Sequence, residues 1–132
     1  MKIMITGADG FLGSNLTREL LSRGHRLVAL VEEGRATPTI DDLPIEKRYG
    51  NLLDPDSLNS AMKGCDALIH IGAIISIWPY RSAIQRKVNI EGARNVMEAA
   101  LSAGLQRVIH VGTANSFGFG TKADPGDETR PY

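Results

Sequence analysis

The chain has a single cysteine, no excess of charge of either sign and no long apolar run. Cys65 has no partner for an internal disulfide, which favours a reducing, cytoplasmic location. Lys and Arg together number 15, as do Asp and Glu together, so no basic surface is offered to nucleic acid or to an anionic membrane. No apolar stretch approaches the roughly 20 residues that cross a bilayer. We therefore expect no nucleic-acid partner, no membrane segment and, because a strand pattern follows Met1 at once, no cleaved leader.

Strand and helix patterns alternate along the 132 residues, a length that suits one domain. Apolar runs predict strands at residues 2–6, 26–31, 67–71 and 107–111, with a short edge strand at 46–49. Amphipathic patterns predict helices at residues 11–23, from 54–55 to about 64, and from about 79 to 102. Residues 119–132 are rich in Gly, Pro, Asp and Thr and are expected to form a polar loop or tail.

Strands that are apolar on both faces are typical of a parallel sheet covered by helices on both sides. With right-handed crossovers, the alternation predicts the doubly wound α/β class, a Rossmann fold. We expect the strand order 3-2-1-4-5. The nucleotide-binding domain would then comprise residues 1–118, with 119–132 outside it.

A glycine-rich turn joins the first predicted strand to the first helix. Residues 6–13 read T-G-A-D-G-F-L-G, with glycines at Gly7, Gly10 and Gly13. The first would permit the tight turn, the second would let a pyrophosphate approach the backbone, and the third would let helix and strand pack closely. Glu32 follows about twenty residues later, at the end of the second strand, as the dinucleotide fingerprint requires. Together these features predict a dinucleotide site.

Four further segments make the chain resemble the extended short-chain dehydrogenases/reductases of the NAD-dependent epimerase/dehydratase type, in particular the dihydroflavonol-reductase-like members. They are G-N-L-L-D at 50–54, H-I-G-A at 70–73, V-N-I-E-G-A-R-N-V at 88–96 and R-V-I-H-V-G-T-A-N-S-F-G at 107–118. In the first, Asn51 replaces the acidic residue that contacts adenine in the family, and an amide could still accept from the adenine amino group. In the second, Gly72 replaces a small alanine. Essentially the whole chain is covered by the resemblance.

Site residues are implied by this resemblance, position by position. Thr113 falls where the family has its catalytic Ser or Thr, and Asn89 falls where an Asn braces the active site. The implied cofactor-binding residues are Gly7, Asp9, Gly10, Phe11, Leu12, Gly13, Glu32, Asn51, Leu52, Ile71, Gly72, Ala73 and Asn89. No His or Cys pair has metal-ligand spacing, so no metal is expected.

The family's acid/base pair, a Tyr with a Lys four residues later, does not occur in these 132 residues. Tyr49 is followed four positions on by Leu53 and Tyr80 by Ile84, and Tyr132 is the last residue. We therefore expect dinucleotide binding with negligible turnover, and a chain that ends before the catalytic segment. Loss of the next helix would expose apolar surface, which favours a homo-oligomer.

The acidic residue after the second strand favours NAD over NADP. Glu32 could accept from the adenosine ribose hydroxyls, and its charge would repel a 2′-phosphate. Relatives that use NADP tend to place an Arg at this position, and Arg35 lies three residues on, so NADP remains possible.

Three functions compete on the sequence alone. The first is the cofactor-binding part of an oxidoreductase or sugar-nucleotide epimerase/dehydratase, acting on a sugar nucleotide or a hydroxy or keto compound. The second is a non-catalytic dinucleotide-sensing module, against which the hydroxyl of Thr113 argues. The third is an interaction fragment with a vestigial nucleotide site, against which the three intact glycines argue.

Overall fold

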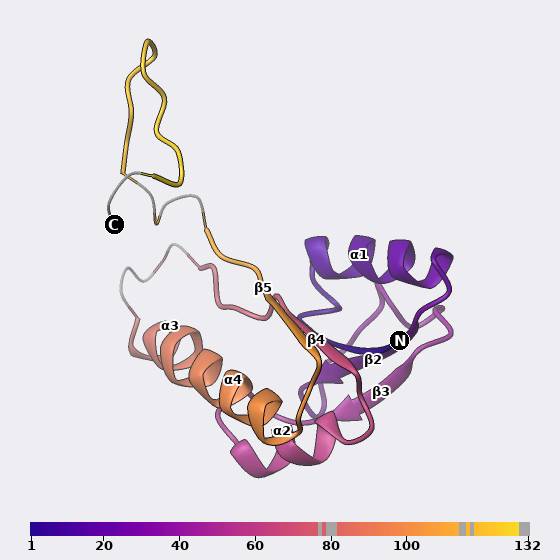
Figure 1. The fold of residues 1–132 in the computed structure, drawn as a ribbon. Helices are drawn as coiled ribbons and strands as arrows, with labels where there is room; N and C mark the ends of the chain where they lie inside the picture. Colours follow the sequence, from indigo (N-terminus) through magenta and orange to yellow (C-terminus); the bar gives the residue numbers. More distant parts are fainter. Residues whose placement is uncertain (77, 79–81, 114–115, 117, 130–132) are drawn as a thin grey trace.

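The structure, a computed structural model, describes residues 1–76, 78, 82–113, 116 and 118–129. A five-stranded, all-parallel sheet has the order β3-β2-β1-β4-β5, which confirms the predicted strand order and the doubly wound α/β fold (Figure 1). The strands are β1 (Lys2–Thr6), β2 (Arg26–Val31), β3 (Glu46–Tyr49), β4 (Ala67–His70) and β5 (Arg107–His110). The helical segments are α1 (Phe11–Ser22), α2 (Pro55–Met62), α3 (Ala83–Arg86), the π-helical η1 (Lys87–Gly92) and α4 (Ala93–Ser102).

Side chains of the central strands alternate between two separate cores, one on each face of the sheet. Met4 of β1 belongs to the core under α2 and α4, whereas Ile3 and Ile5 belong to the core under α1. Figure 1 shows α1 on one side of the sheet and α2 and α4 on the other. Burial on both faces explains why β1, β2 and β4 are continuously apolar in sequence.

Local signals set most of the helix limits. Asp54 caps α2, because its side chain accepts from the backbone N–H groups of Asp56 and Ser57, and Pro55 occupies the first helical position. The predicted ends lie one or two residues too late: α1 ends at Ser22 and α2 at Met62. Such small differences are usual at helix ends, where the last turn often departs from α geometry.

The third predicted helix, residues 79–102, is not a single α-helix. Its described part begins at Ala83, capped by the hydroxyl of Ser82, and residues 79–81 lie outside the described residues. Between α3 and α4 the backbone is π-helical over Lys87–Gly92. At Gly92 an added Cβ would lie 3.0 Å from the Cβ of Leu52, so the helix approaches that loop closely. The spacing of apolar residues in the sequence does not predict such a local change of helical pitch.

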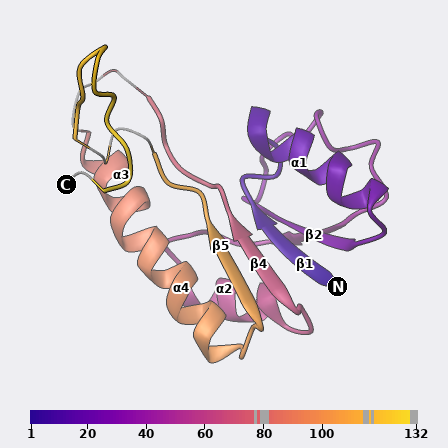
Figure 2. The same ribbon diagram turned by 45° about the horizontal axis from the view of Figure 1, so that its top comes forward.

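The last strand departs from the prediction of a strand buried on both faces. All four residues of β5 are exposed, with Val108 and Ile109 at 40% and 48%. Figure 2 shows β5 at the edge of the sheet, with β4 as its one neighbour. An apolar run cannot reveal whether another layer covers it, which is the reason for the error. Among the described residues, no helix combines the length and apolarity that crossing a bilayer requires.

Candidate functional site

One large cavity of about 1030 Å³ lies beyond the carboxyl ends of the strands. Loops that follow β1, β2, β3, β4 and β5 all contribute to its lining. In open α/β sheets this is the edge at which ligands bind. Every residue to which the sequence assigned a cofactor or catalytic role lies on this cavity, from Gly7 in the first loop to Thr113 in the last.

The three glycines of the first loop have different physical roles. Gly7 has a φ of 71°, and an added Cβ there would lie 2.9 Å from Gly72 in the loop after β4. At Gly13 an added Cβ would lie 2.0 Å from the carbonyl oxygen of Gly7, so any side chain would push α1 off the loop. At Gly10 it would meet only that same oxygen, at 3.3 Å. Of the three glycines, Gly10 is therefore the one at which an added Cβ is least obstructed, and it lines the cavity.

The amino end of α1 offers backbone donors to the cavity. Gly10 is the N-cap and supplies no side chain to bond the first-turn N–H groups. Helix N-termini carry a partial positive charge, and their free N–H groups suit a phosphate or pyrophosphate. The side chain of Phe11 is 91% exposed beside this end of the helix. These features fit the pyrophosphate of a dinucleotide.

Two histidines face each other across neighbouring strands at the floor of the cavity. His70 of β4 and His110 of β5 are paired in register, and their rings stack with centroids 5.1 Å apart. His70 is 2% exposed, and this burial, with His110 as a second cause, lowers the pKa of His70 to about 4. His70 is therefore neutral at physiological pH. Nδ1 of His70 lies 2.6 Å from the hydroxyl oxygen of Thr6, so the buried ring has a hydrogen-bond partner.

Polar side chains at the far end of the cavity are already paired with one another. Nδ2 of Asn51 donates to the carboxylate of Glu32 at 2.9 Å. Oδ1 of Asn51 accepts from the backbone N–H of Leu53 at 2.8 Å. We expected this oxygen to accept from the adenine amino group. That hydrogen bond would compete with the one that Oδ1 already accepts from Leu53. In this structure Asn51 holds Glu32 and the 51–53 turn.

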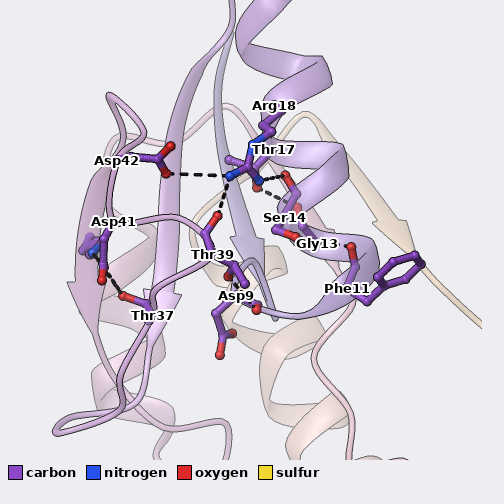
Figure 3. A network of polar contacts seen from close by, with 11 residues as sticks. Asp9, Phe11, Gly13, Ser14, Thr17, Arg18, Thr37, Thr39, Asp41 and Asp42 are labelled. Atoms are coloured by element: carbon purple, nitrogen blue, oxygen red, sulfur yellow. Dashed lines mark hydrogen bonds and ion pairs between the residues drawn. The ribbon is translucent and has the colours of Figure 1, made fainter.

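The loop after β2 is attached to the glycine loop and to α1, as Figure 3 shows. The hydroxyl of Thr39 donates to the backbone oxygen of Asp9 at 2.8 Å. Arg18 of α1 donates to the backbone oxygen of Thr39, also at 2.8 Å. The next residue, Ile40, is fully buried in the core under α1. The loop after β2 thus has a buried side chain, Ile40, and defined contacts to α1 and to the glycine loop.

At the other end of the cavity, side chains fasten the loop that follows β4. Asn89 accepts from the N–H of Ile74 at 2.8 Å and donates to its carbonyl oxygen at 2.9 Å. Gln85 donates to the same oxygen at 3.2 Å, a contact that sequence reasoning missed. Asn95, also missed, donates to the backbone oxygen of Leu52 at 3.0 Å. The implied bracing role of Asn89 agrees with this geometry, and the V-N-I-E-G-A-R-N-V segment already contained both asparagines.

Thr113, the implied catalytic hydroxyl, follows β5 on the cavity wall beyond His110. Its backbone oxygen accepts from the N–H and the hydroxyl of Ser116. Within the 107–118 motif, residues 114, 115 and 117 lie outside the described residues. Where the structure describes the chain, no group of three or more His, Cys, Asp and Glu side chains could hold a metal ion.

Comparisons with known proteins agree with this geometry. The family model described as "NAD dependent epimerase/dehydratase family" matches residues 3–132. A putative dihydroflavonol 4-reductase of Synechocystis is 35% identical over 95% of this chain. The match covers 36% of that relative, and the chain spans little more than a third of the length of the curated relatives it matches.

Solved structures share the fold. The crystal structure of gox2253 matches with a TM-score of 0.91 and 39% identity, over 98% of this chain and 39% of that one. The Bordetella bronchiseptica enzyme WbmH, crystallised in complex with NAD⁺, matches with a TM-score of 0.76 and 27% identity, over 89% of this chain and 40% of that one.

Proposed function

Since the chain belongs to the NAD-dependent epimerase/dehydratase family, we propose that residues 1–132 are the NAD-binding part of an oxidoreductase or sugar-nucleotide epimerase/dehydratase. The observation that carries the proposal is the position of Gly10, which caps α1 without a side chain and faces the cavity that the loops after all five strands line. Backbone donors at this point would bind the pyrophosphate. When bound, the nicotinamide would carry hydride to or from a substrate carbon.

The two ends of the cavity would then hold the two halves of the dinucleotide. Glu32, which Asn51 holds by a 2.9 Å hydrogen bond, would accept from the adenosine ribose hydroxyls. The nicotinamide half would lie toward the loops after β4 and β5, where Gly72 lines the cavity and Thr113 offers a hydroxyl. WbmH, 27% identical to this chain, was crystallised in complex with NAD⁺, which supports the binding of a dinucleotide.

Coenzyme choice, substrate and assembly are part of the same proposal. We propose NAD in preference to NADP, because the Glu32 carboxylate would repel a 2′-phosphate. The substrate would be a small molecule, a sugar nucleotide or a hydroxy or keto compound, in a reducing, cytoplasmic location. Because these 132 residues hold no Tyr and Lys at the family's spacing, they would bind the coenzyme without measurable turnover.

Calorimetric titration of the protein with NAD⁺ and NADP⁺ tests the proposal directly. We expect NAD⁺ to bind, and Gly10→Val to abolish binding because its side chain would occupy the approach of the pyrophosphate. Ala103→Val, an exposed position at the end of α4, is the matched control and should bind normally. If a folded protein bound neither nucleotide, the proposal would be wrong.

A homo-oligomer is proposed from the exposed apolar side chains of β5, Val108 and Ile109. An edge strand with apolar side chains is a surface at which chains associate. Sedimentation velocity should therefore give a species heavier than one chain, and Ile109→Lys should shift it toward the monomer. A monomer at all concentrations tested would contradict this part.

A further inference from the structure

An ion pair joins the glycine loop to the turn after β2 at the adenosine end of the cavity. Nε of Arg35 donates to the carboxylate of Asp9, and the two atoms are 2.5 Å apart. The side chain of Asp9 is 13% exposed, whereas that of Arg35 is 57% exposed. Both residues line the cavity together with Glu32. The guanidinium is therefore held by a carboxylate that the fold has largely withdrawn from water.

Arg35 lies close to the point where a ribose 2′ substituent would be recognised. Its backbone N–H donates to the carbonyl oxygen of Glu32 at 3.1 Å, so Arg35 closes the turn that begins at the end of β2. A guanidinium is the side-chain group best suited to a phosphate monoester, which it can bind through two parallel hydrogen bonds. By position and chemistry, Arg35 would bind a 2′-phosphate if it were not paired with Asp9.

We propose that Asp9 is a coenzyme-specificity residue, which favours NAD by binding Arg35 and so denying its guanidinium to the 2′-phosphate of NADP. The inference rests on the proposed function, because it concerns the same nucleotide site. Glu32 and Asp9 have different tasks in it. Glu32 repels the phosphate, and Asp9 occupies Arg35, which among the described residues is the one Lys or Arg side chain that lines the cavity.

The placement of Asp9 does not depend on the ion pair alone. Its backbone oxygen accepts from the hydroxyl of Thr39, and Arg18 of α1 in turn donates to the backbone oxygen of Thr39. Asp9 also lies between the Gly7 turn and Gly10, whose N–H donates to the oxygen of Gly7 at 3.1 Å. The replacement Asp9→Asn would therefore remove the charge and leave the backbone contacts of residue 9 in place.

The net charge of Asp9, Glu32 and Arg35 also disfavours the 2′-phosphate of NADP. Two carboxylates and one guanidinium carry an excess of negative charge, and a phosphate monoester brings about 1.5 to 2 further negative charges at neutral pH. Asp9→Asn would leave one carboxylate and one guanidinium, so the repulsion falls while a donor becomes available.

The experiment measures Kd for NAD⁺ and NADP⁺ by calorimetry in wild type, Asp9→Asn, Arg35→Gln and the double variant. We expect Asp9→Asn to lower the ratio of the NADP⁺ Kd to the NAD⁺ Kd by about tenfold, the scale of one new charge-assisted hydrogen bond. Adding Arg35→Gln should restore the wild-type ratio. Glu19→Gln is the matched control, because Glu19 is bound to Arg23 at 2.7 Å on α1, outside the cavity, and its loss should leave the ratio unchanged.

Arg35→Lys is an independent test that does not threaten folding, because the side chain is mostly exposed, and it keeps the positive charge beside the Asp9 carboxylate while removing the forked guanidinium. It should leave the affinity for NADP⁺ within about twofold of wild type, since Asp9 already occupies the guanidinium. A tenfold loss would show that Arg35 is available in the wild type and would overturn the inference. If Asp9→Asn does not fold, as judged by circular dichroism, this variant decides.

The outcomes separate this inference from the proposed function. If wild type binds NAD⁺ but Asp9→Asn leaves the ratio unchanged, the role of Asp9 is wrong and the proposed function stands. If Asp9→Asn lowers the ratio equally with and without Arg35, bulk charge is responsible and the role of Arg35 is wrong. If folded wild-type protein binds neither coenzyme, both the proposed function and this inference fail.

Discussion

The hydroxyl oxygen of Thr6 lies 2.6 Å from Nδ1 of His70, and this contact assigns the proton on the imidazole ring. The same oxygen accepts from the backbone N–H groups of Ile71 and Gly72, at 3.2 and 3.0 Å. A hydroxyl has two lone pairs and one hydrogen, so with both lone pairs in use the hydrogen goes to His70. Nδ1 is therefore the acceptor, and a neutral His70 carries its hydrogen on Nε2. Thr6 thereby ties the end of β1 to the loop after β4 that lines the cavity.

Thr6→Val should lower the free energy of unfolding by about 2 to 4 kcal/mol. The variant keeps the shape of the side chain but leaves Nδ1 of buried His70 and the N–H of Gly72 without this partner. Urea unfolding followed by circular dichroism measures the loss. Thr6→Ser keeps the hydroxyl and is the control; it should recover at least half of the loss. Equal losses in both variants would contradict the hydrogen-bonding role.

Stability should fall as the pH drops from about 6.5 toward 4, because of His70. Burial lowers the pKa of His70 from 6.5 to about 4, so between these values the unfolded chain binds a proton that the folded protein excludes. Neutral His70 makes its full contribution to the free energy of unfolding above pH 6.5. On the order of 2 kcal/mol of that free energy should be lost by pH 4. Urea unfolding at several pH values gives the slope, and NMR titration of the ring, assigned with His70→Gln, gives the pKa directly. A folded-state pKa at or above 6.5 would rule this out.

Alanine at Gly13 should mainly lower stability, whereas alanine at Gly10 should mainly weaken NAD⁺ binding. Gly13→Ala should lose about 3 kcal/mol or more, because its Cβ would lie 2.0 Å from the oxygen of Gly7. Gly10→Ala should change stability by about 1 kcal/mol at most, since its nearest contact is at 3.3 Å, yet it should weaken NAD⁺ binding. Thermal unfolding and calorimetry together separate the two. Equal stability of the two variants would contradict the packing assigned to Gly13.

Asn51→Asp should weaken NAD⁺ binding several-fold through its effect on Glu32. The aspartate keeps the oxygen that accepts from the N–H of Leu53, but it loses the donor to Glu32 and places two carboxylates together. Calorimetric titration with NAD⁺ is the measurement. Asn59→Asp makes the same chemical change at an exposed position of α2, outside the cavity, and should leave NAD⁺ binding unchanged.

Much of the fold could be read from local signals. The limits of β1, β2 and β3 agree with the prediction residue for residue, and the Asp54 and Pro55 start of α2 is as expected. Those signals are short-range: strand runs, a capping side chain, a proline without an N–H. The π-helical stretch Lys87–Gly92 was not foreseen, because it depends on how closely the helix approaches Leu52 rather than on the spacing of apolar residues.

The sequence by itself determined the doubly wound fold, the three glycines of the first loop and the residues that line the cavity, since each depends on neighbours in the chain. Tertiary structure alone decided which polar groups find partners. Arg35 with Asp9, Asn51 with Glu32 and Thr6 with His70 are far apart in the sequence. They meet because parallel strands bring the loops at their carboxyl ends to one edge of the sheet. No local pattern encodes those pairings, and they decide which side chains remain available to a ligand.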